Sequence, residues 1–145
     1  MDIMLINTQP FLVTISVNLA FTTVEHLKDR SGRSILKAIH NVCAIYKARG
    51  FNVHQANVDN EFSSYDVNFH LLGIQPNITS SVEHVPEIEC SIRVIKERCR
   101  ALRQTLPYRR IPRLLTVALD QFTAKKLNEF PTKGGLPNIT PRTLL

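Results

Sequence analysis

Cysteine is scarce in this chain of 145 residues, and the three that occur lie far apart. Because Cys43, Cys90 and Cys99 are odd in number and widely spaced, they argue against a disulfide framework and favour a reducing compartment. The sequence has no Cys-x-x-Cys or His-x-x-x-His pattern, so it does not indicate a zinc site.

Long apolar runs are also missing. There is no stretch of about eighteen apolar residues, so we expect no membrane span. The N-terminus lacks a basic segment followed by a long apolar stretch, so no signal peptide or other targeting signal is visible. We therefore expect an intracellular protein. With 43% hydrophobic and 21% charged residues, the composition is that of one soluble globular domain.

Acidic residues are nearly absent from one long segment. The whole chain carries a net charge of +6, but residues 90–113 contain eight basic side chains and one acid, Glu97, which gives 8 − 1 = +7. A localised basic stripe is the electrostatic signature of a nucleic-acid or phosphate partner. A solvated helix face is the alternative interpretation.

The order of periodic patterns predicts a mixed α/β fold. Residues 2–7 form a strand, and the apolar odd positions from Phe11 to Phe21 predict a hairpin that turns near Asn18. Ser34 can cap a helix that ends before Gly50. Further strands are expected over 51–58 and near 74–81, and further helices over 61–72, 86–106 and 111–130. This order fits one mixed sheet with helices on both faces.

The helix over 86–106 presents two faces. On a helical wheel at about 100° per residue, one apolar row points to the core. Its members are Ile88, Ile92, Ile95, Cys99, Leu102 and Leu106. A second row begins with Glu89 and continues with four cations, Arg93, Lys96, Arg100 and Arg103. The helix dipole and an ordinary i,i+4 ion pair could explain this second row equally well.

Three carboxylates occupy comparable places. Asp2 lies on the first strand, Asp59 ends the fourth, and Glu89 lies in the first turn of the long helix. If the first and fourth strands are neighbours, the three side chains converge, and without a cation at least one should be protonated. Mg²⁺ prefers such hard oxygen ligands, and a pair of ions can promote phosphoryl transfer. Glu83 and Glu87 stay open as rivals to Glu89, but Glu89 alone has cations four and seven positions on.

The chain resembles the catalytic core of retroviral and retrotransposon integrases, in the ribonuclease H-like superfamily, and is most similar to the copia type. The resemblance covers about residues 2–130. It rests on "DIMLINTQPFLVTISVNLAFTTVEHL", on "VDNEF" and on "HVPEIECSIRVIKERCRAL", in that order. In "VDNEF", Glu61 stands where many relatives have glycine, and the spacing from Asp59 to Glu89 is shorter than usual.

The resemblance implies a ribonuclease H-like, mixed five-stranded sheet whose first three strands are antiparallel. It implies a Mg²⁺- or Mn²⁺-dependent polynucleotidyl transferase that trims DNA 3′ ends and joins them to target DNA, working in the nucleus as a homo-oligomer. Asp2, Asp59 and Glu89 would be the catalytic metal ligands, and Asn60 would help to shape the site. The expected DNA contacts are Arg93, Lys96, Arg100 and Arg103.

The resemblance also suggests how the chain is divided. We expect a catalytic core over 1–108, a C-terminal helix of the same domain over 109–130, and a tail or linker over 131–145. Asp2 follows the first Met directly, so the first strand lacks upstream residues, which is the pattern of a truncated or decayed copy. Two alternatives to an integrase therefore remain: a catalytically inactive nucleic-acid-binding remnant, and a nuclease of the same superfamily.

Overall fold

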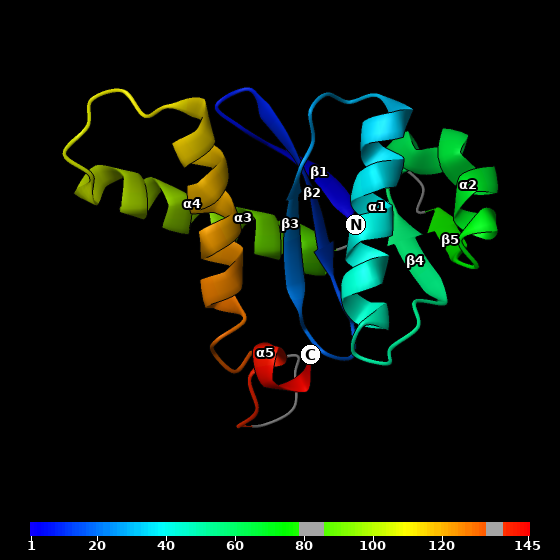
Figure 1. Ribbon diagram of the computed structural model, residues 1–145. Coiled ribbons are helices and arrows are strands. Elements are labelled where there is room, and N and C mark those ends of the chain that lie inside the picture. Colours follow the sequence, from blue (N-terminus) through cyan, green and yellow to red (C-terminus); the bar gives the residue numbers. More distant parts are fainter. Residues whose placement is uncertain (79–85, 133–137) are drawn as a thin grey trace.

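The computed structural model describes residues 1–78, 86–132 and 138–145, which form a mixed α/β fold (Figure 1). The strands are β1 (Asp2–Ile6), β2 (Gln9–Ile15), β3 (Thr22–His26), β4 (Gln55–Val58) and β5 (Gln75–Ile78). The helices are α1 (Gly32–Lys47), the 3₁₀ helix η1 (Asn60–Tyr65), α2 (Asp66–Leu71), α3 (Pro86–Thr105), α4 (Arg113–Leu127) and α5 (Pro141–Leu144).

The first three strands form an antiparallel sheet in the order β1-β2-β3, which confirms the predicted opening of the fold. The alternation in β2 separates its side chains between the two faces, because successive residues of a strand point to opposite sides. Phe11 and Val13 enter one apolar cluster, whereas Leu12 enters the other. The sheet therefore carries a core on each face.

Strands β4 and β5 form a second, parallel sheet of two strands. The prediction of one continuous five-stranded sheet is therefore not confirmed for the described part of the chain. The first strand approaches β4 at its beginning, where the Met1 amino group donates a hydrogen bond of 2.6 Å to the Asn57 carbonyl oxygen. A continuous ladder would require a series of such backbone bonds along both strands.

Helices cover both faces of the central sheet (Figure 1). On one side, α1 packs Ile35 and Ile39 against Leu12, Val58 and other buried residues. On the other side, α3 and α4 complete a cluster around Met4, Phe11 and Ile95. Helix α1 begins earlier than predicted: its N-cap is Ser31, whose hydroxyl accepts a hydrogen bond from the Ser34 amide.

The end of the chain folds back onto the domain. Within the predicted tail, α5 brings Leu145 into a cluster with Val42 and Tyr46 of α1. The Arg142 amide also donates to the Asn128 carbonyl oxygen at 3.0 Å. In the described residues, no helix combines the length and the apolar character that crossing a membrane requires.

Candidate functional site

Asp2 is the first residue of β1, and Asp59 directly follows the last residue of β4. Asp59 follows the buried Val58 and becomes the N-cap of η1, where its side chain accepts a hydrogen bond of 2.7 Å from the Asn60 amide. The Asp2 side chain accepts one of 2.6 Å from the Ile3 amide. Both carboxylates are thus oriented by the backbone that follows them.

The two carboxylates interact electrostatically. Burial raises the pKa of Asp2, and the negative charges of Asp59 and Glu61 raise it further, against the opposing effect of the hydrogen bond from Ile3. The Met1 amino group is buried beside them: desolvation lowers its pKa, while Asp2 and Asp59 act in the other direction. Negative charge is therefore concentrated where the two sheets meet.

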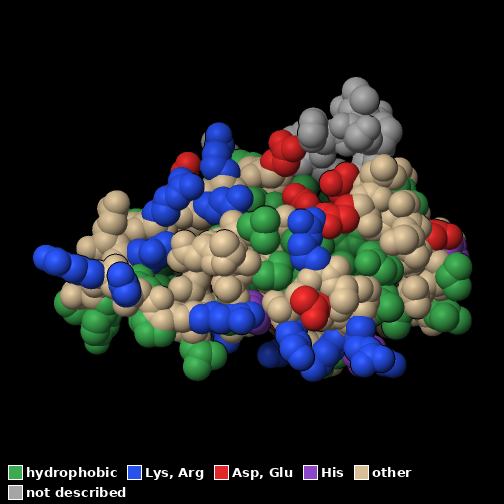
Figure 2. Space-filling view, turned by 90° about the horizontal axis from the view of Figure 1, so that it is seen from above, with side chains coloured by type: hydrophobic (Ala, Val, Ile, Leu, Met, Phe, Trp, Pro, Cys, Tyr) green, Lys and Arg blue, Asp and Glu red, His purple; other side chains and the backbone are tan. Residues whose placement is uncertain are grey.

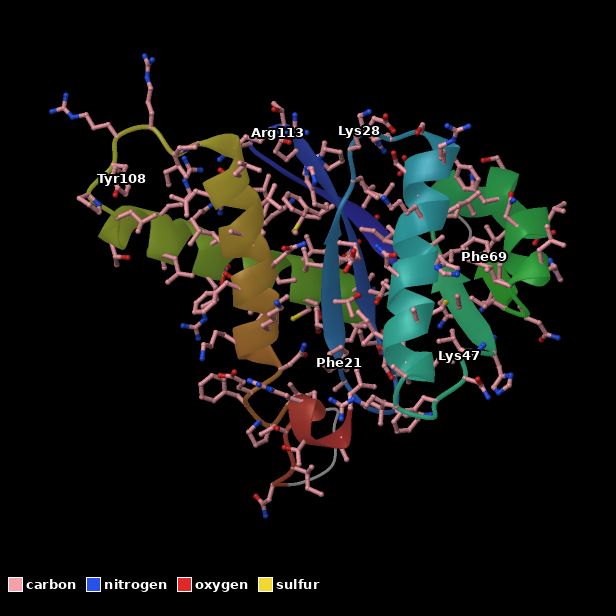
Figure 3. All side chains as sticks on the ribbon, in the orientation of Figure 1. Phe21, Lys28, Lys47, Phe69, Tyr108 and Arg113 are labelled. Atoms are coloured by element: carbon pink, nitrogen blue, oxygen red, sulfur yellow. The ribbon has the colours of Figure 1, made fainter. Side chains whose placement is uncertain are left out.

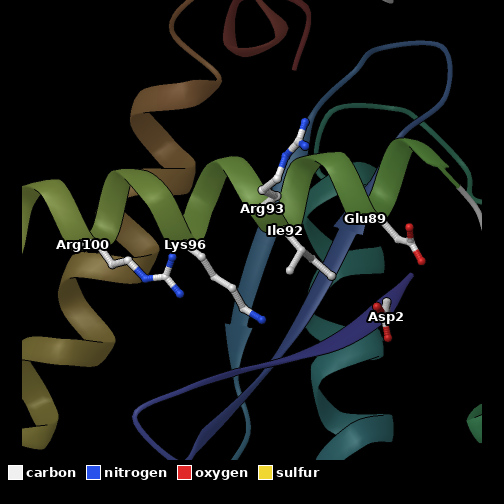
Figure 4. Close-up of a pocket in the computed structure, with 6 residues that line it drawn as sticks. All are labelled: Asp2, Glu89, Ile92, Arg93, Lys96 and Arg100. Atoms are coloured by element: carbon white, nitrogen blue, oxygen red, sulfur yellow. The ribbon is translucent and has the colours of Figure 1, made fainter.

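Glu89 shares a pocket with Asp2. The pocket has a volume of about 280 Å³ and is lined by Asp2, Glu89, Ile92, Arg93, Lys96 and Arg100. Figure 4 shows the side chains of Asp2 and Glu89 at the same end of this pocket, one from β1 and the other from the first turn of α3. Glu87 does not line the pocket, and Glu83 lies outside the described residues.

The donor set suits a hard divalent cation, but the geometry is looser than a preformed metal centre. Within residues 1–78, 86–132 and 138–145, no group of three or more His, Cys, Asp or Glu side chains is arranged to hold a metal ion. Mg²⁺ usually takes one or two carboxylates, with waters and substrate phosphates completing its shell. Asp2 with Asp59, or Asp2 with Glu89 at the same end of the pocket, would supply the two carboxylates of such partial coordination. The set of three ligands stays a prediction.

The cations of α3 form one wall of the site. Arg93, Lys96 and Arg100 line the pocket; in Figure 4 Lys96 and Arg100 extend on the side of α3 that faces β1, whereas the Arg93 side chain extends on the opposite side of the helix. Arg103 is directed elsewhere, because its guanidinium donates a hydrogen bond of 2.9 Å to the Asn7 side chain in the β1–β2 turn. Figure 2 shows acidic side chains gathered on one face, with Lys and Arg side chains to the left of them and below.

One ion pair near the site has no counterpart in the sequence analysis. Arg30, in the segment between β3 and α1, pairs with Glu61 in the first turn of η1. These residues are 31 positions apart, so no helical or strand periodicity connects them. The one available signal was Glu61 itself, a second acidic side chain two positions after Asp59.

Comparison with known proteins shows which known fold the chain has. No family model matches the chain, and no curated protein matches it. Among solved structures, the catalytic core domain of BIV integrase superposes with a TM-score of 0.68 at 16% sequence identity. The similar region covers 99% of this chain and 90% of that domain. The chain therefore has the fold of this integrase catalytic core domain.

Proposed function

We propose that the chain is the catalytic core of an integrase-type polynucleotidyl transferase from a copia-type retrotransposon. One observation carries this proposal: in an integrase-core fold, Asp2 and Glu89 face the same pocket, beside cations of α3. An enzyme that transfers phosphoryl groups needs carboxylates for divalent cations and positive charges for the nucleic-acid backbone. The pocket combines both.

Asp2, Asp59 and Glu89 are the residues that would hold Mg²⁺ or Mn²⁺. When bound, the cations would supply activation of a water molecule or a 3′-hydroxyl and stabilisation of the leaving oxygen. The chain's own contribution is to hold the three carboxylates in position. The amides of Ile3 and Asn60 orient Asp2 and Asp59, and the first turn of α3 carries Glu89 across from Asp2.

Arg93, Lys96 and Arg100 would bind phosphates of the element ends and of the target DNA. Such contacts hold the DNA in register without reading its sequence, and they weaken as salt increases. Arg103 would contribute less, since Asn7 already accepts a hydrogen bond from it. Activity on DNA would place the protein in the nucleus, where a homo-oligomer could engage two DNA ends.

A cleavage and joining assay on labelled DNA with Mn²⁺ tests the proposal. The wild-type chain should shorten the 3′ ends and join them to target DNA, whereas Glu89→Gln should lose both reactions and keep DNA binding. Cutting without joining would indicate a nuclease of the same fold. Equal activity of wild type and Glu89→Gln would contradict the role of Glu89.

A second function is favoured by a specific observation. Because the described residues contain no group of three ligands arranged for a metal, the chain could be a decayed copy that binds nucleic acid without catalysis. The same assay separates the two functions. A remnant would bind DNA through α3 and leave both DNA strands intact with Mn²⁺.

A further inference from the structure

Helix α1 lies in a second segment of the chain that lacks acidic residues. Residues 30–58 contain five arginines and lysines and no aspartate or glutamate, which gives this segment a charge of +5. The basic segment over 90–113 belongs to α3 and the residues after it, and the proposed function already uses cations from it. The charge around α1 has no role in that function. Because like charges repel one another in a folded chain, such a surface favours a partner of opposite charge.

One exposed face of α1 carries its cations in a row. At about 100° per residue, four later positions of the helix fall within about 40° of the exposed Arg33. They are Lys37, His40, Ala44 and Lys47, and all four are exposed. At about 1.5 Å per residue, the row from Arg33 to Lys47 is about 21 Å long. Figure 3 shows Lys28 and Lys47 near the two ends of the helix, so positive charge extends along its whole length.

The cations of this row form no ion pair within the described parts of the chain. Three acids contact α1 or the residues just before it, but each has another partner. They are Glu25, which accepts a hydrogen bond from Asn41, Asp29, which accepts from Ser31 and Ser34, and Glu61, which pairs with Arg30. The ion pairs of the described residues do not include Arg33, Lys37 or Lys47. These three charges are therefore available to an external anion.

The α1 row and the α3 pocket lie on opposite faces of the central sheet. Helix α1 packs against the face that carries Leu12, whereas α3 packs against the face that carries Phe11 and Val13, with the strands between them (Figure 1). Duplex DNA is stiff, with a persistence length of about 50 nm, so one short duplex cannot follow both faces. Cations on the two faces would therefore bind separate duplex segments.

The composition of the row favours a phosphate backbone as its partner. B-DNA carries about one negative charge per 1.7 Å of its axis, so a row of about 21 Å faces many phosphates. Contacts to phosphates need cations and polar groups but no apolar anchor. A protein interface usually buries aromatic or aliphatic anchors at its centre, and a lipid surface takes up large apolar side chains beside the cations. The one apolar side chain on the row is the small Ala44.

We propose that the exposed row of α1 is a second phosphate-binding surface, on which Arg33, Lys37 and Lys47 hold a segment of duplex DNA away from the α3 pocket. This inference rests on the proposed function, which makes DNA the polyanion, and it needs no metal ion. It goes beyond that function because one chain would hold two duplex segments on opposite sides of its sheet. Binding at α1 would be independent of sequence and would weaken as salt increases.

The number of duplexes bound per chain tests this inference. A labelled duplex of about 12 base pairs, about 40 Å long, is titrated with the chain in a chelator at low salt. Wild type should bind two duplexes per chain. The α1 triple variant, Arg33→Gln with Lys37→Gln and Lys47→Gln, should bind the second duplex more weakly by more than about 10-fold, since three phosphate contacts are lost. Glutamine keeps the helix propensity of arginine and lysine, so α1 should stay folded.

Two further variants separate the position of the charge from its amount. Arg33→Lys with Lys37→Arg and Lys47→Arg keeps the charge of the row and should bind both duplexes. Arg98→Gln with Arg109→Gln and Lys125→Gln removes three charges from exposed positions outside the row, and it should also bind both. If this last variant loses the second duplex as the α1 triple variant does, net charge explains the binding and the inference is overturned.

The remaining outcomes distinguish this inference from the proposed function. A wild type that binds one duplex per chain, or an α1 triple variant that binds two as tightly as wild type, would overturn the inference while the proposed function stands. Displacement of the second duplex by an equal charge of poly-glutamate would indicate a surface for acidic protein and would also overturn it. A wild type that binds no duplex would overturn both.

Discussion

At the scale of single residues, Asp120 on α4 is the most unusual ionisable group outside the site. It is 1% exposed, and its Oδ2 has no hydrogen-bond partner among the described residues. Burial raises the pKa of this carboxyl, while Cys99 and Arg103 act to lower it. The same burial, together with Asp120, raises the pKa of Cys99 to about 12. An isolated buried carboxylate is costly, so protonation favours the folded state.

Asp120 should therefore make stability depend on pH. Because its pKa is higher in the folded chain than the value of about 3.9 in an unfolded chain, the folded state holds the proton more tightly. The free energy of unfolding should fall as pH rises from about 4 through the raised pKa. Asp120→Asn removes this titration, so urea denaturation from pH 4 to 7 should show a flatter pH profile than wild type.

Asp29→Asn provides the opposite control. Hydrogen bonds from Ser31 and Ser34 lower the pKa of Asp29 to about 2, so its contribution is present at neutral pH and is lost as the pH falls toward 2. This variant should be less stable than wild type at pH 7, with the difference disappearing in acid. Identical pH profiles for wild type and Asp120→Asn would contradict the account of Asp120.

At the scale of elements, α3 shows how far sequence patterns reach. The wheel predicted its buried row, and Ile88, Ile95 and Cys99 are indeed buried against the sheet. It also grouped four cations on one face, but it could not show that Arg103 would meet Asn7 of the β1–β2 turn. Periodicity gives the direction of a side chain from its helix, whereas the neighbour it meets depends on the tertiary fold.

The pocket-lining cations of α3 can be tested against two exposed arginines, one elsewhere on α3 and one beyond its end. Arg93→Ala with Lys96→Ala should reduce the salt slope of DNA binding by about 1.8, because each phosphate contact releases about 0.9 counterion. Arg98→Ala with Arg109→Ala removes the same charge from exposed positions that do not line the pocket. If both double variants lower the slope equally, the pocket-lining cations have no special role.

The sequence predicted where helix α4 lies in the chain, over 111–130, but not which of its faces is buried. Its buried face carries Thr116, Asp120 and Thr123, with Asn128 following as the C-cap. The Asn128 side chain both accepts from the Thr22 amide and donates to the Thr22 carbonyl oxygen, at 2.9 and 2.7 Å. These bonds add to the apolar packing of α4 on the cluster that contains Val24 of β3, to which α4 contributes Ala124, Val117 and Leu127. No pattern in the sequence indicates that the polar row is the inner one.

At the scale of the whole molecule, a row of apolar side chains lies on the exposed side of α4. Leu114 is 83% exposed and Phe122 is 47% exposed, with the exposed Ala118 between them along the helix. Apolar side chains aligned in this way often mark a surface that another protein covers. We propose that this row supports the expected self-association.

Leu114→Glu with Phe122→Glu should therefore give a monomer in analytical ultracentrifugation, because the added charges would be desolvated in a dimer. Since both positions are exposed, the stability of the monomer should change by less than about 0.5 kcal/mol. Val67→Glu with Leu71→Glu, at two exposed apolar positions on α2, is the matched control. A monomeric wild type, or equal effects of both double variants, would exclude the α4 row.

The topology shows a further limit of prediction at this scale. The alternation of apolar and polar residues predicted the antiparallel strands. The order of the predicted strands and helices indicated the fold class. Whether β1 and β4 form one ladder depends on backbone pairing between distant segments, which side-chain patterns do not specify. The approach of Asp2 to Asp59 was likewise expected only on the condition that the first and fourth strands are neighbours, and no local pattern fixes that condition.

The central claim is that Asp2, Asp59 and Glu89 hold divalent metal, and a Mn²⁺ titration followed by thermal denaturation tests it most directly. Wild type should be stabilised by about 2.7 kcal/mol at a hundred times the dissociation constant, since the ion binds the folded chain alone. Asp59→Asn should lose this stabilisation, whereas Asp66→Asn, the same change further along the chain, should keep it. Equal stabilisation of wild type and Asp59→Asn by Mn²⁺ would contradict the claim.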